Sequence, residues 1–149
     1  MTFVQRRTLA VERPRLWEFL MDVPAVARCL PGVEGLEAVD ETTYRGTLRI
    51  QVGPVRLALE GTLAIEARDR EGWRASLRAD ARDRRLGGGV RARMAMTLRP
   101  AGEGRTELVV ETDLSVLGKI GEFGQPVIRK KADALLETFA ANVEAALAG

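Results

Sequence analysis

Five consecutive segments in the middle of the chain alternate between apolar and polar residues with a period of two. The segments are 44–52, 55–67, 73–82, 90–99 and 106–116. Turn residues separate them, among them Gly53-Pro54 and Gly87-Gly88-Gly89. A period of two places alternate side chains on opposite faces of a β-strand, and a meander with one solvated face is typical of antiparallel sheets. The pattern therefore predicts a sheet of long antiparallel strands with one apolar face.

The flanking segments have other periods. A further strand is expected over 3–11, short helices over 14–21 and 24–30, and another strand over 34–39. After the last alternating segment, apolar residues recur every three or four positions over 126–147, which indicates an amphipathic helix about 33 Å long. Glycines at 118, 121 and 124 and Pro126 weaken the start of this helix, because Gly and Pro are poor helix formers.

These elements predict one α+β domain over residues 1–149, a size at which a chain buries a substantial core. A seven-stranded antiparallel sheet with a single long helix must curl around that helix to hide its apolar face. The expected architecture is therefore a helix-grip fold: a curved seven-stranded antiparallel sheet wrapped around one long C-terminal helix, with two short helices after the first strand.

The apolar face of the predicted sheet carries no charged side chain, and its few hydroxyl groups include those of Tyr44 and Thr112. Many of its positions hold Gly or Ala, such as Gly61, Ala67 and Ala79. Interiors pack to a density of about 0.74, so small side chains in the middle of a large curved sheet leave voids that cost stability unless something fills them. We therefore expect an uncharged cavity for an apolar small molecule. Its predicted wall residues are Tyr44, Leu48, Leu59, Leu63, Ala79, Ala81, Ala92, Met94, Met96 and Thr112.

The sequence leaves a second arrangement open. The long helix is itself rich in alanine, and it could press against the small residues of the sheet to give a dry, filled core. For each predicted wall residue, an ordinary core position is therefore the alternative.

Histidine is absent from the chain, and Cys29 is its only cysteine. These counts exclude nucleophilic systems that need a histidine base, and they leave too few ligands for a zinc site. We expect no metal and no covalent cofactor. A single cysteine also excludes an internal disulfide and fits a reducing cytoplasm, and the N-terminus lacks the apolar stretch of a secretory signal. The cysteine lies at the C-terminal end of the short helix predicted over 24–30, where the helix dipole disfavours a thiolate, so we expect it to be inert.

Charge is unevenly spread along the chain. The net formal charge is +2, but the segment from Arg68 to Arg99 holds ten arginines and only four acids. A basic face suits anionic head groups or an acidic partner, whereas a solvated strand face is the alternative reading. Aromatic residues do not alternate with the arginines, so we expect no nucleic-acid binding.

Several motifs resemble the G-subunit family of carbon monoxide dehydrogenase over essentially the whole chain. They are Trp17-Glu18-Phe19-Leu20-Met21-Asp22, Cys29-Leu30-Pro31-Gly32-Val33, Val52-Gly53-Pro54 with Gly61, the run 116–124, and Phe139-Ala140-Ala141-Asn142. That family belongs to the START/polyketide-cyclase-like superfamily of helix-grip proteins, in agreement with the fold expected from periodicity.

The resemblance implies a non-catalytic accessory protein of a molybdenum hydroxylase such as carbon monoxide dehydrogenase. It would act in membrane recruitment or in delivering a lipophilic quinone as electron acceptor. The bound molecule would then be a quinone or another lipid, and any membrane contact would be peripheral, at the inner face of the cell membrane. In helix-grip proteins the cavity mouth lies near the start of the long helix, so the gate candidates are Leu30, Ile120, Phe123 and Val127.

Two rival functions remain at this point. One is a cyclase or dehydratase on the same fold, although such an enzyme needs an acid or base inside its cavity, and Tyr44 and two threonines are the polar groups on offer. The other is a docking module with a filled core that holds the dehydrogenase through its arginines.

Overall fold

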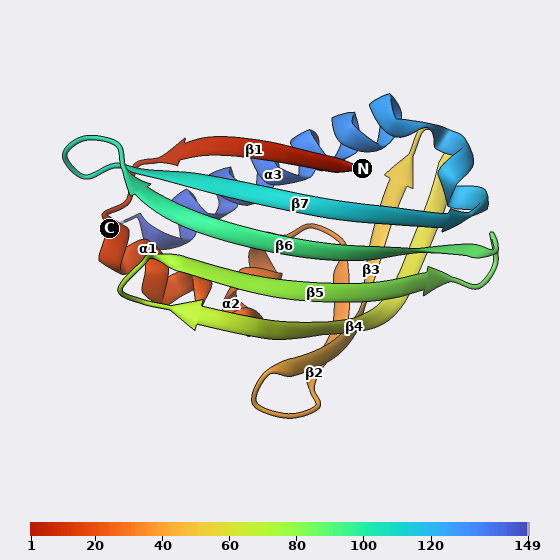
Figure 1. Ribbon diagram of the computed structural model, residues 1–149, viewed down its shortest axis with the longest axis horizontal. Coiled ribbons are helices and arrows are strands. Elements are labelled where there is room, and N and C mark those ends of the chain that lie inside the picture. Colours follow the sequence, from red (N-terminus) through yellow and green to blue (C-terminus); the bar gives the residue numbers. More distant parts are fainter. Residues whose placement is uncertain (149) are drawn as a thin grey trace.

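The computed structural model of the chain describes residues 1–148, so the last residue of the predicted domain, Gly149, lies outside the described residues. Figure 1 shows the elements in their chain order. They are β1 (Thr2–Leu9), α1 (Arg13–Leu20), α2 (Val23–Cys29), β2 (Val33–Ala38), β3 (Thr43–Val52), β4 (Val55–Asp69), β5 (Arg74–Asp83), β6 (Gly88–Pro100), β7 (Thr106–Gly118), the 3-10 helix η1 (Lys119–Phe123) and α3 (Gln125–Leu147).

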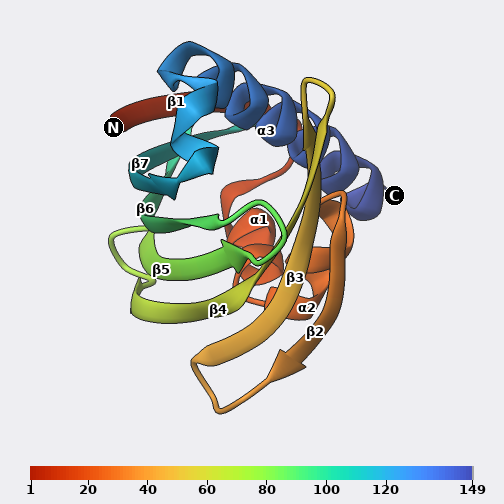
Figure 2. The same cartoon turned by 90° about the vertical axis from the view of Figure 1, so that its right-hand side faces the viewer.

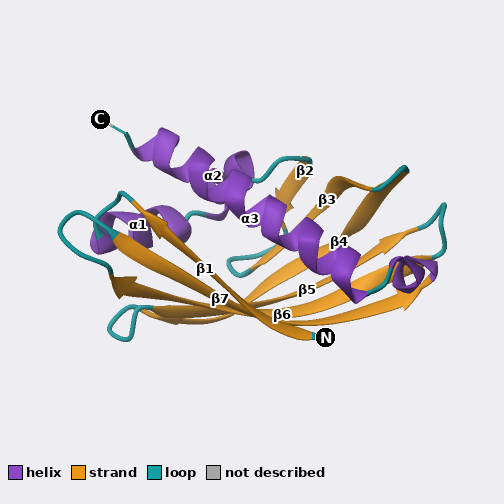
Figure 3. Cartoon of the chain, turned by 90° about the horizontal axis from the view of Figure 1, so that it is seen from above, coloured by secondary structure: helices purple, strands orange, loops and turns teal. Residues whose placement is uncertain are grey.

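The seven strands form one antiparallel sheet in the order β1-β7-β6-β5-β4-β3-β2. The sheet curls, and α3 lies along its concave side with α1 and α2 at one end (Figures 2 and 3). This arrangement confirms the predicted helix-grip fold. We call the face toward α3 the inner face and the opposite face the outer face.

Element boundaries differ most from the expectation at the end of the first strand and before the long helix. The first strand ends at Leu9 rather than at residue 11, and α1 begins at Arg13 with Pro14 in its first turn, where a missing N–H costs nothing. The segment 119–123 forms a separate 3-10 helix instead of a frayed start of the long helix. Gly118 and Gly124 on either side of η1 have positive φ angles of 67° and 86°, which explains the interruption.

Alternation predicts that Ala67 lies on the inner face, but in the structure it lies on the outer face. The pairing of β4 with β5 shifts between Ile65 and Ala67, so Ala67 lies opposite Ser76 while Arg68 lies opposite the buried Ala75. An extra residue in a strand turns every later side chain to the other face. Trp73, the first residue of the predicted segment 73–82, is not part of the strand. It lies in the turn before β5 with a φ of 56°.

The glycines of the sheet have a reason other than an empty interior. A Cβ atom on Gly61 would lie 1.9 Å from the backbone oxygen of Asp80, and one on Gly89 would lie 2.6 Å from the oxygen of Ala81. Both positions therefore need glycine because β4 and β6 approach β5 too closely for a side chain. The small size of Gly61 therefore follows from this close approach of the strands, and whether the small inner-face residues leave a void stays a prediction.

Two separate hydrophobic clusters make up the core. The first core cluster joins α1, α2, α3 and the sheet at one end, with Leu16, Leu98 and Val143 almost fully buried. The second core cluster lies at the other end and consists of Val52, Leu57, Leu59 and Ile120 with the half-buried side chains around them. The ends of the grip are thus packed independently of each other.

Polar contacts hold α3 to the margin of the sheet. Gln5 of β1 donates a hydrogen bond of 2.8 Å to Asp133 of α3, and Arg129 contacts the same carboxylate at 3.1 Å. The bond from Gln5 is the largest cause holding the pKa of Asp133 below its ordinary value. The guanidinium of Arg129 also lies 4.9 Å from the ring centre of Phe3. At the far end of α3, Asn142 donates to the backbone oxygen of Cys29 at 2.9 Å.

Candidate functional site

A row of inner-face residues crosses the middle of the sheet between the two core clusters. Tyr44 of β3 lies opposite Leu63 of β4, Leu63 opposite Ala79 of β5, and Ala79 opposite Ala92 of β6. We call these four residues the middle row. All four are half-buried, and within residues 1–148 neither core cluster includes any of them. The middle row is therefore an uncharged strip that the packed core leaves partly uncovered.

The placement of α3 explains why this strip is uncovered. Within residues 1–148 the main backbone approaches of α3 are to β1, α2, β3 and η1, rather than to β4, β5 or β6. The helix thus bridges the two margins of the curved sheet and leaves its middle strands at a distance. Ile128, Ala132 and Leu135 of α3 are half-buried as well and belong to neither cluster.

The other predicted wall residues border the middle row. Met94 and Met96 pack against the first core cluster, whereas Leu48 and Ala81 pack against the second, of which Leu59 is a buried member. All of the predicted wall residues share the inner face, because their cross-strand partners are inner-face residues. The strand register thus brings the predicted wall residues together on the inner face. Some of them pack into one of the two core clusters, and the others form the middle row between the clusters. Their role as ligand contacts stays a prediction.

Thr112 of β7 carries a buried polar atom without a partner. The residue is only 7% exposed, and its hydroxyl has no hydrogen-bond partner among the described residues. Its neighbours in the sheet are Phe3 on one side and Met94 on the other. An unsatisfied buried hydroxyl costs about 1–3 kcal/mol, so it is a specific feature of this interior that needs an explanation.

Tyr44 also lines a groove that the sequence did not indicate. The groove has a volume of about 300 Å3 and runs between α2 and β2, with Pro24, Ala27, Val33 and Leu36 among its walls. Its walls are mostly apolar apart from Arg28 and the phenol of Tyr44. The signal missing from the sequence was the packing of α2 over an edge strand, which no local pattern reveals.

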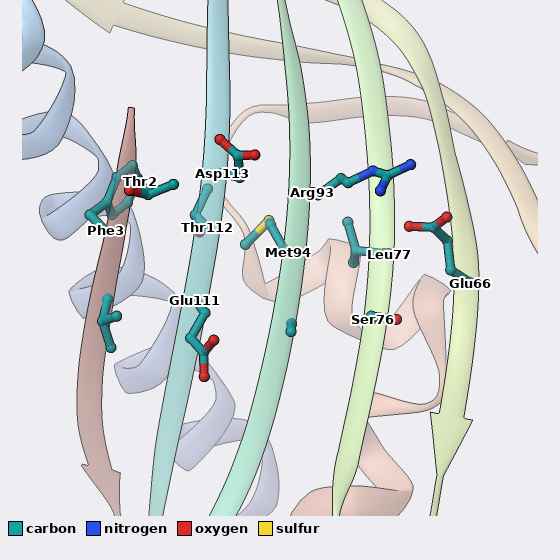
Figure 4. A pocket seen from close by; sticks show the side chains of 12 residues that line it. Thr2, Phe3, Glu66, Ser76, Leu77, Arg93, Met94, Glu111, Thr112 and Asp113 are labelled. Atoms are coloured by element: carbon teal, nitrogen blue, oxygen red, sulfur yellow. The ribbon is translucent and has the colours of Figure 1, made fainter.

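A larger hollow of about 490 Å3 lies on the outer face of the sheet (Figure 4). Its charged walls are Glu66, Arg93, Glu111 and Asp113, which come from β4, β6 and β7 and alternate with the inner-face residues. Figure 4 shows them spread over neighbouring strands rather than converging on one point. Two of the predicted wall residues, Met94 and Thr112, line this hollow as well. The hollow is open, mixed in charge and on the opposite side of the sheet from the middle row, so it differs from the uncharged interior cavity that the sequence predicts.

The four gate candidates lie in different surroundings. Ile120 of η1 is a buried member of the second core cluster, and Phe123 is half-buried against it. Leu30 follows the last turn of α2 and is half-buried, whereas Val127 in the first turn of α3 is 44% exposed. Their role as a gate stays a prediction.

Cys29 is buried in the first core cluster, and this burial raises the pKa of its thiol. The nearby Arg28 has a smaller, opposite effect. A thiol with a raised pKa is a poor nucleophile, in agreement with the inert role expected from the sequence.

Carboxylates accompany the arginines of the outer face. Arg74 lies 3.8 Å from Glu111, and Arg91 lies 3.2 Å from Asp80. In the strand register Arg93 faces Asp113, and Arg99 faces Glu107. The outer face is therefore a mixed, solvated surface rather than a basic one. Among the helices of residues 1–148, none combines the length and apolar character needed to cross a bilayer.

Comparisons with known structures support the fold. A conserved protein from Geobacillus kaustophilus superposes with a TM-score of 0.89 at 21% identity, covering 99% of this chain and 95% of that chain. A START superfamily protein from Mycobacterium smegmatis gives 0.71 at 14% identity, with 98% and 96% covered. Norcoclaurine synthase from Thalictrum flavum gives 0.66 at 15% identity, with 99% and 86% covered. At these identities the likeness shows a shared fold.

A search of curated proteins returned no match. The family model of the carbon monoxide dehydrogenase G-subunit (CoxG), in contrast, matches residues 8–148, nearly the full length. The match spans strands β2 to β7, the two short helices and α3, including the motifs on which the resemblance rested. The chain therefore belongs to the CoxG family of carbon monoxide dehydrogenase and has a START-like fold.

Proposed function

We propose that this protein is a non-catalytic carrier that binds a hydrophobic small molecule, specifically a quinone, between the middle row and α3. The molecule would serve a molybdenum hydroxylase of the carbon monoxide dehydrogenase type as electron acceptor. Family membership supports the accessory role, and the fold supports ligand binding inside the grip.

The single observation that carries the proposal is the half-buried, uncharged middle row between two closed core clusters. Apolar side chains left partly open to water between two packed regions lose hydrophobic stabilisation, which an apolar guest would restore. At about 25 cal/mol per Å2, burial of roughly 400 Å2 of ring and isoprenoid surface contributes on the order of 10 kcal/mol before entropic costs.

The polar groups beside the row fit a neutral guest with hydrogen-bond acceptors. Tyr44 and Thr112 can each donate a hydroxyl hydrogen, whereas the row offers no charge to pair with a carboxylate or an amine. A carbonyl oxygen that reached Thr112 would satisfy its unpartnered hydroxyl. Because Tyr44 lies on β3 and Thr112 on β7, either hydroxyl alone would orient a quinone ring, while the apolar surface supplies most of the affinity.

Native mass spectrometry of freshly purified protein, followed by titration with menadione, a naphthoquinone without an isoprenoid chain, tests the proposal. We expect a co-purified lipid or, after its removal, one menadione per chain with a rise in melting temperature. Ala92→Leu should weaken this binding because the added side chain occupies the proposed site. Ala95→Leu is the matched control, since Ala95 is on the same strand but lines the outer hollow.

The rival functions give different results in the same experiment. A docking module with a filled core would purify empty, and menadione would leave its melting temperature unchanged. An enzyme of the cyclase type would turn over a polyketide-like substrate and lose that activity in Tyr44→Phe, because Tyr44 is the titratable residue of the middle row. Equal weakening of menadione binding by Ala92→Leu and Ala95→Leu would also contradict the proposed site.

A further inference from the structure

One end of the molecule gathers three turns and the start of α3. The β3–β4 turn at Gly53-Pro54, the β5–β6 turn at 84–87, and η1 lie together at the right-hand end of Figure 1. Lys119 of η1 donates a backbone hydrogen bond of 3.0 Å to Gly87, and the side chain of Arg85 donates one of 2.9 Å to the backbone of Arg56. These bonds join the turns into one surface, which we call the tip.

The tip has an excess of positive charge. Its exposed cations are Arg56, Arg84, Arg85, Lys119 and Lys130. Its exposed carboxylates are Glu122 and Glu60, and Glu60 lies 3.6 Å from Arg84, whose side chain is 89% exposed. The remaining acid, Asp83, is buried and accepts hydrogen bonds from two backbone N–H groups, so its carboxylate points into the protein. Five cations thus face two carboxylates here, in a chain whose net charge is only +2.

Apolar side chains are exposed among these cations. Val127 and Leu117 are two of the four large hydrophobic residues found most exposed among the described residues, at 44% and 40%. Pro54 and Pro126 are exposed as well. Val127 and Lys130 are three positions apart and so lie on one side of α3. Cations interleaved with exposed apolar groups are the pattern of surfaces that adsorb to the head-group region of a bilayer.

We infer that the tip is the surface with which this protein docks on a membrane of anionic lipids. The other basic candidate, the outer face, has less unbalanced charge, because its arginines at 74, 91, 93 and 99 already face carboxylates in neighbouring strands. The inference rests on the proposed function for its purpose, since a carrier of a lipophilic molecule collects it from a bilayer. Docking itself depends only on the charge and exposure of the tip.

Vesicle co-sedimentation of the ligand-free protein tests the docking surface. We expect binding to vesicles of phosphatidylcholine with about one third phosphatidylglycerol, weaker binding at high salt, and little binding to phosphatidylcholine alone. Each cation near an anionic surface strengthens binding about fivefold, so the triple variant Arg84→Glu, Arg85→Glu, Lys119→Glu should bind at least about 100-fold more weakly.

The matched control is Arg45→Glu, Arg78→Glu, Arg93→Glu, which changes net charge by the same amount at three exposed positions of the outer face. It should retain most of the binding. Equal loss in the two triple variants would overturn the inference, because the attraction would then follow net charge alone. Binding of polyglutamate but not of vesicles through the tip would also overturn it, in favour of an acidic protein partner.

A labelling experiment gives a second, independent measurement. Val127→Cys carrying an environment-sensitive dye should shift to the blue on anionic vesicles, whereas the same dye on Glu103→Cys in the β6–β7 turn should not. Cys29 does not interfere because its thiol is buried. A shift at Glu103→Cys alone would place the contact at the wrong end of the molecule. Because menadione binding is measured without vesicles and docking without menadione, the two proposals fail separately.

Discussion

The substitution Ala92→Leu distinguishes an open interior from a filled one by the sign of its effect on stability. Ala92 lies in the middle row, between Ala79 of β5 and Leu114 of β7, and is half-buried. Three added carbon atoms would gain about 2.4 kcal/mol if fully buried, at about 0.8 kcal/mol per methylene. Because the position is half-buried, we expect about half of that, an increase of about 1 kcal/mol in the free energy of unfolding.

A filled core predicts the opposite sign. Extra methylenes forced into a close-packed interior typically cost about 1–3 kcal/mol. Ala75→Leu provides that reference within the same sheet, since Ala75 is buried in the first core cluster. Urea unfolding of the ligand-free proteins measures both variants. The open interior is refuted if Ala92→Leu destabilises the protein as much as Ala75→Leu does.

Three further predictions concern the frame around the interior. Asp83→Asn should lower the free energy of unfolding by about 1.5–3 kcal/mol, because the buried carboxylate accepts backbone hydrogen bonds from Ala58 and Leu86. These bonds hold the pKa of Asp83 below its ordinary value of 3.8. The stabilisation that the carboxylate contributes is therefore complete above pH 3.8 and is lost as the pH falls through the folded-state pKa. A difference in unfolding free energy between wild type and Asp83→Asn that persists unchanged in acid would contradict this. Gly61→Ala should destabilise the protein by about 1–3 kcal/mol in thermal unfolding, because its Cβ would collide with β5. Gly121→Ala is the control and should be tolerated. Similar melting temperatures for the two variants would show that the strands do not meet as described. The Cys29 thiol should react with Ellman's reagent only after denaturation, and rapid reaction at neutral pH in the native state would disprove its burial.

Much of the fold was predictable because long strands leave a local signal. Alternation identified β3 to β7 and their inner faces, since each pattern depends only on which residues meet water. The error at Ala67 arose because a bulge at Glu66 is set by pairing with β5, and no residue in the segment itself marks it. Gly118 and Gly124 predict only a weak start of the long helix, because the sequence does not reveal that both have positive φ angles. These angles make η1 a separate element.

The sequence predicts which residues of the candidate site share one face of the sheet, but not which of them border open space. Reading every second residue placed Tyr44, Leu63 and Ala92 on one side of the sheet, as the register confirms. Which of them lie in packed core and which lie between the clusters depends on where α3 approaches the sheet, a long-range property. The hydrogen bonding of Thr112 and Asp83 is likewise a long-range property. Nothing in the sequence indicates that the Thr112 hydroxyl has no partner or that the Asp83 carboxylate accepts backbone hydrogen bonds.

The central claim is that a guest occupies the space beside the middle row. Nuclear Overhauser contacts between bound menadione and the methyl groups of selectively labelled alanines measure this directly. We predict contacts to Ala79 and Ala92 on the inner face. Contacts to Ala95 in the outer hollow without any to Ala79 or Ala92, or no contacts at saturating menadione, would contradict the claim.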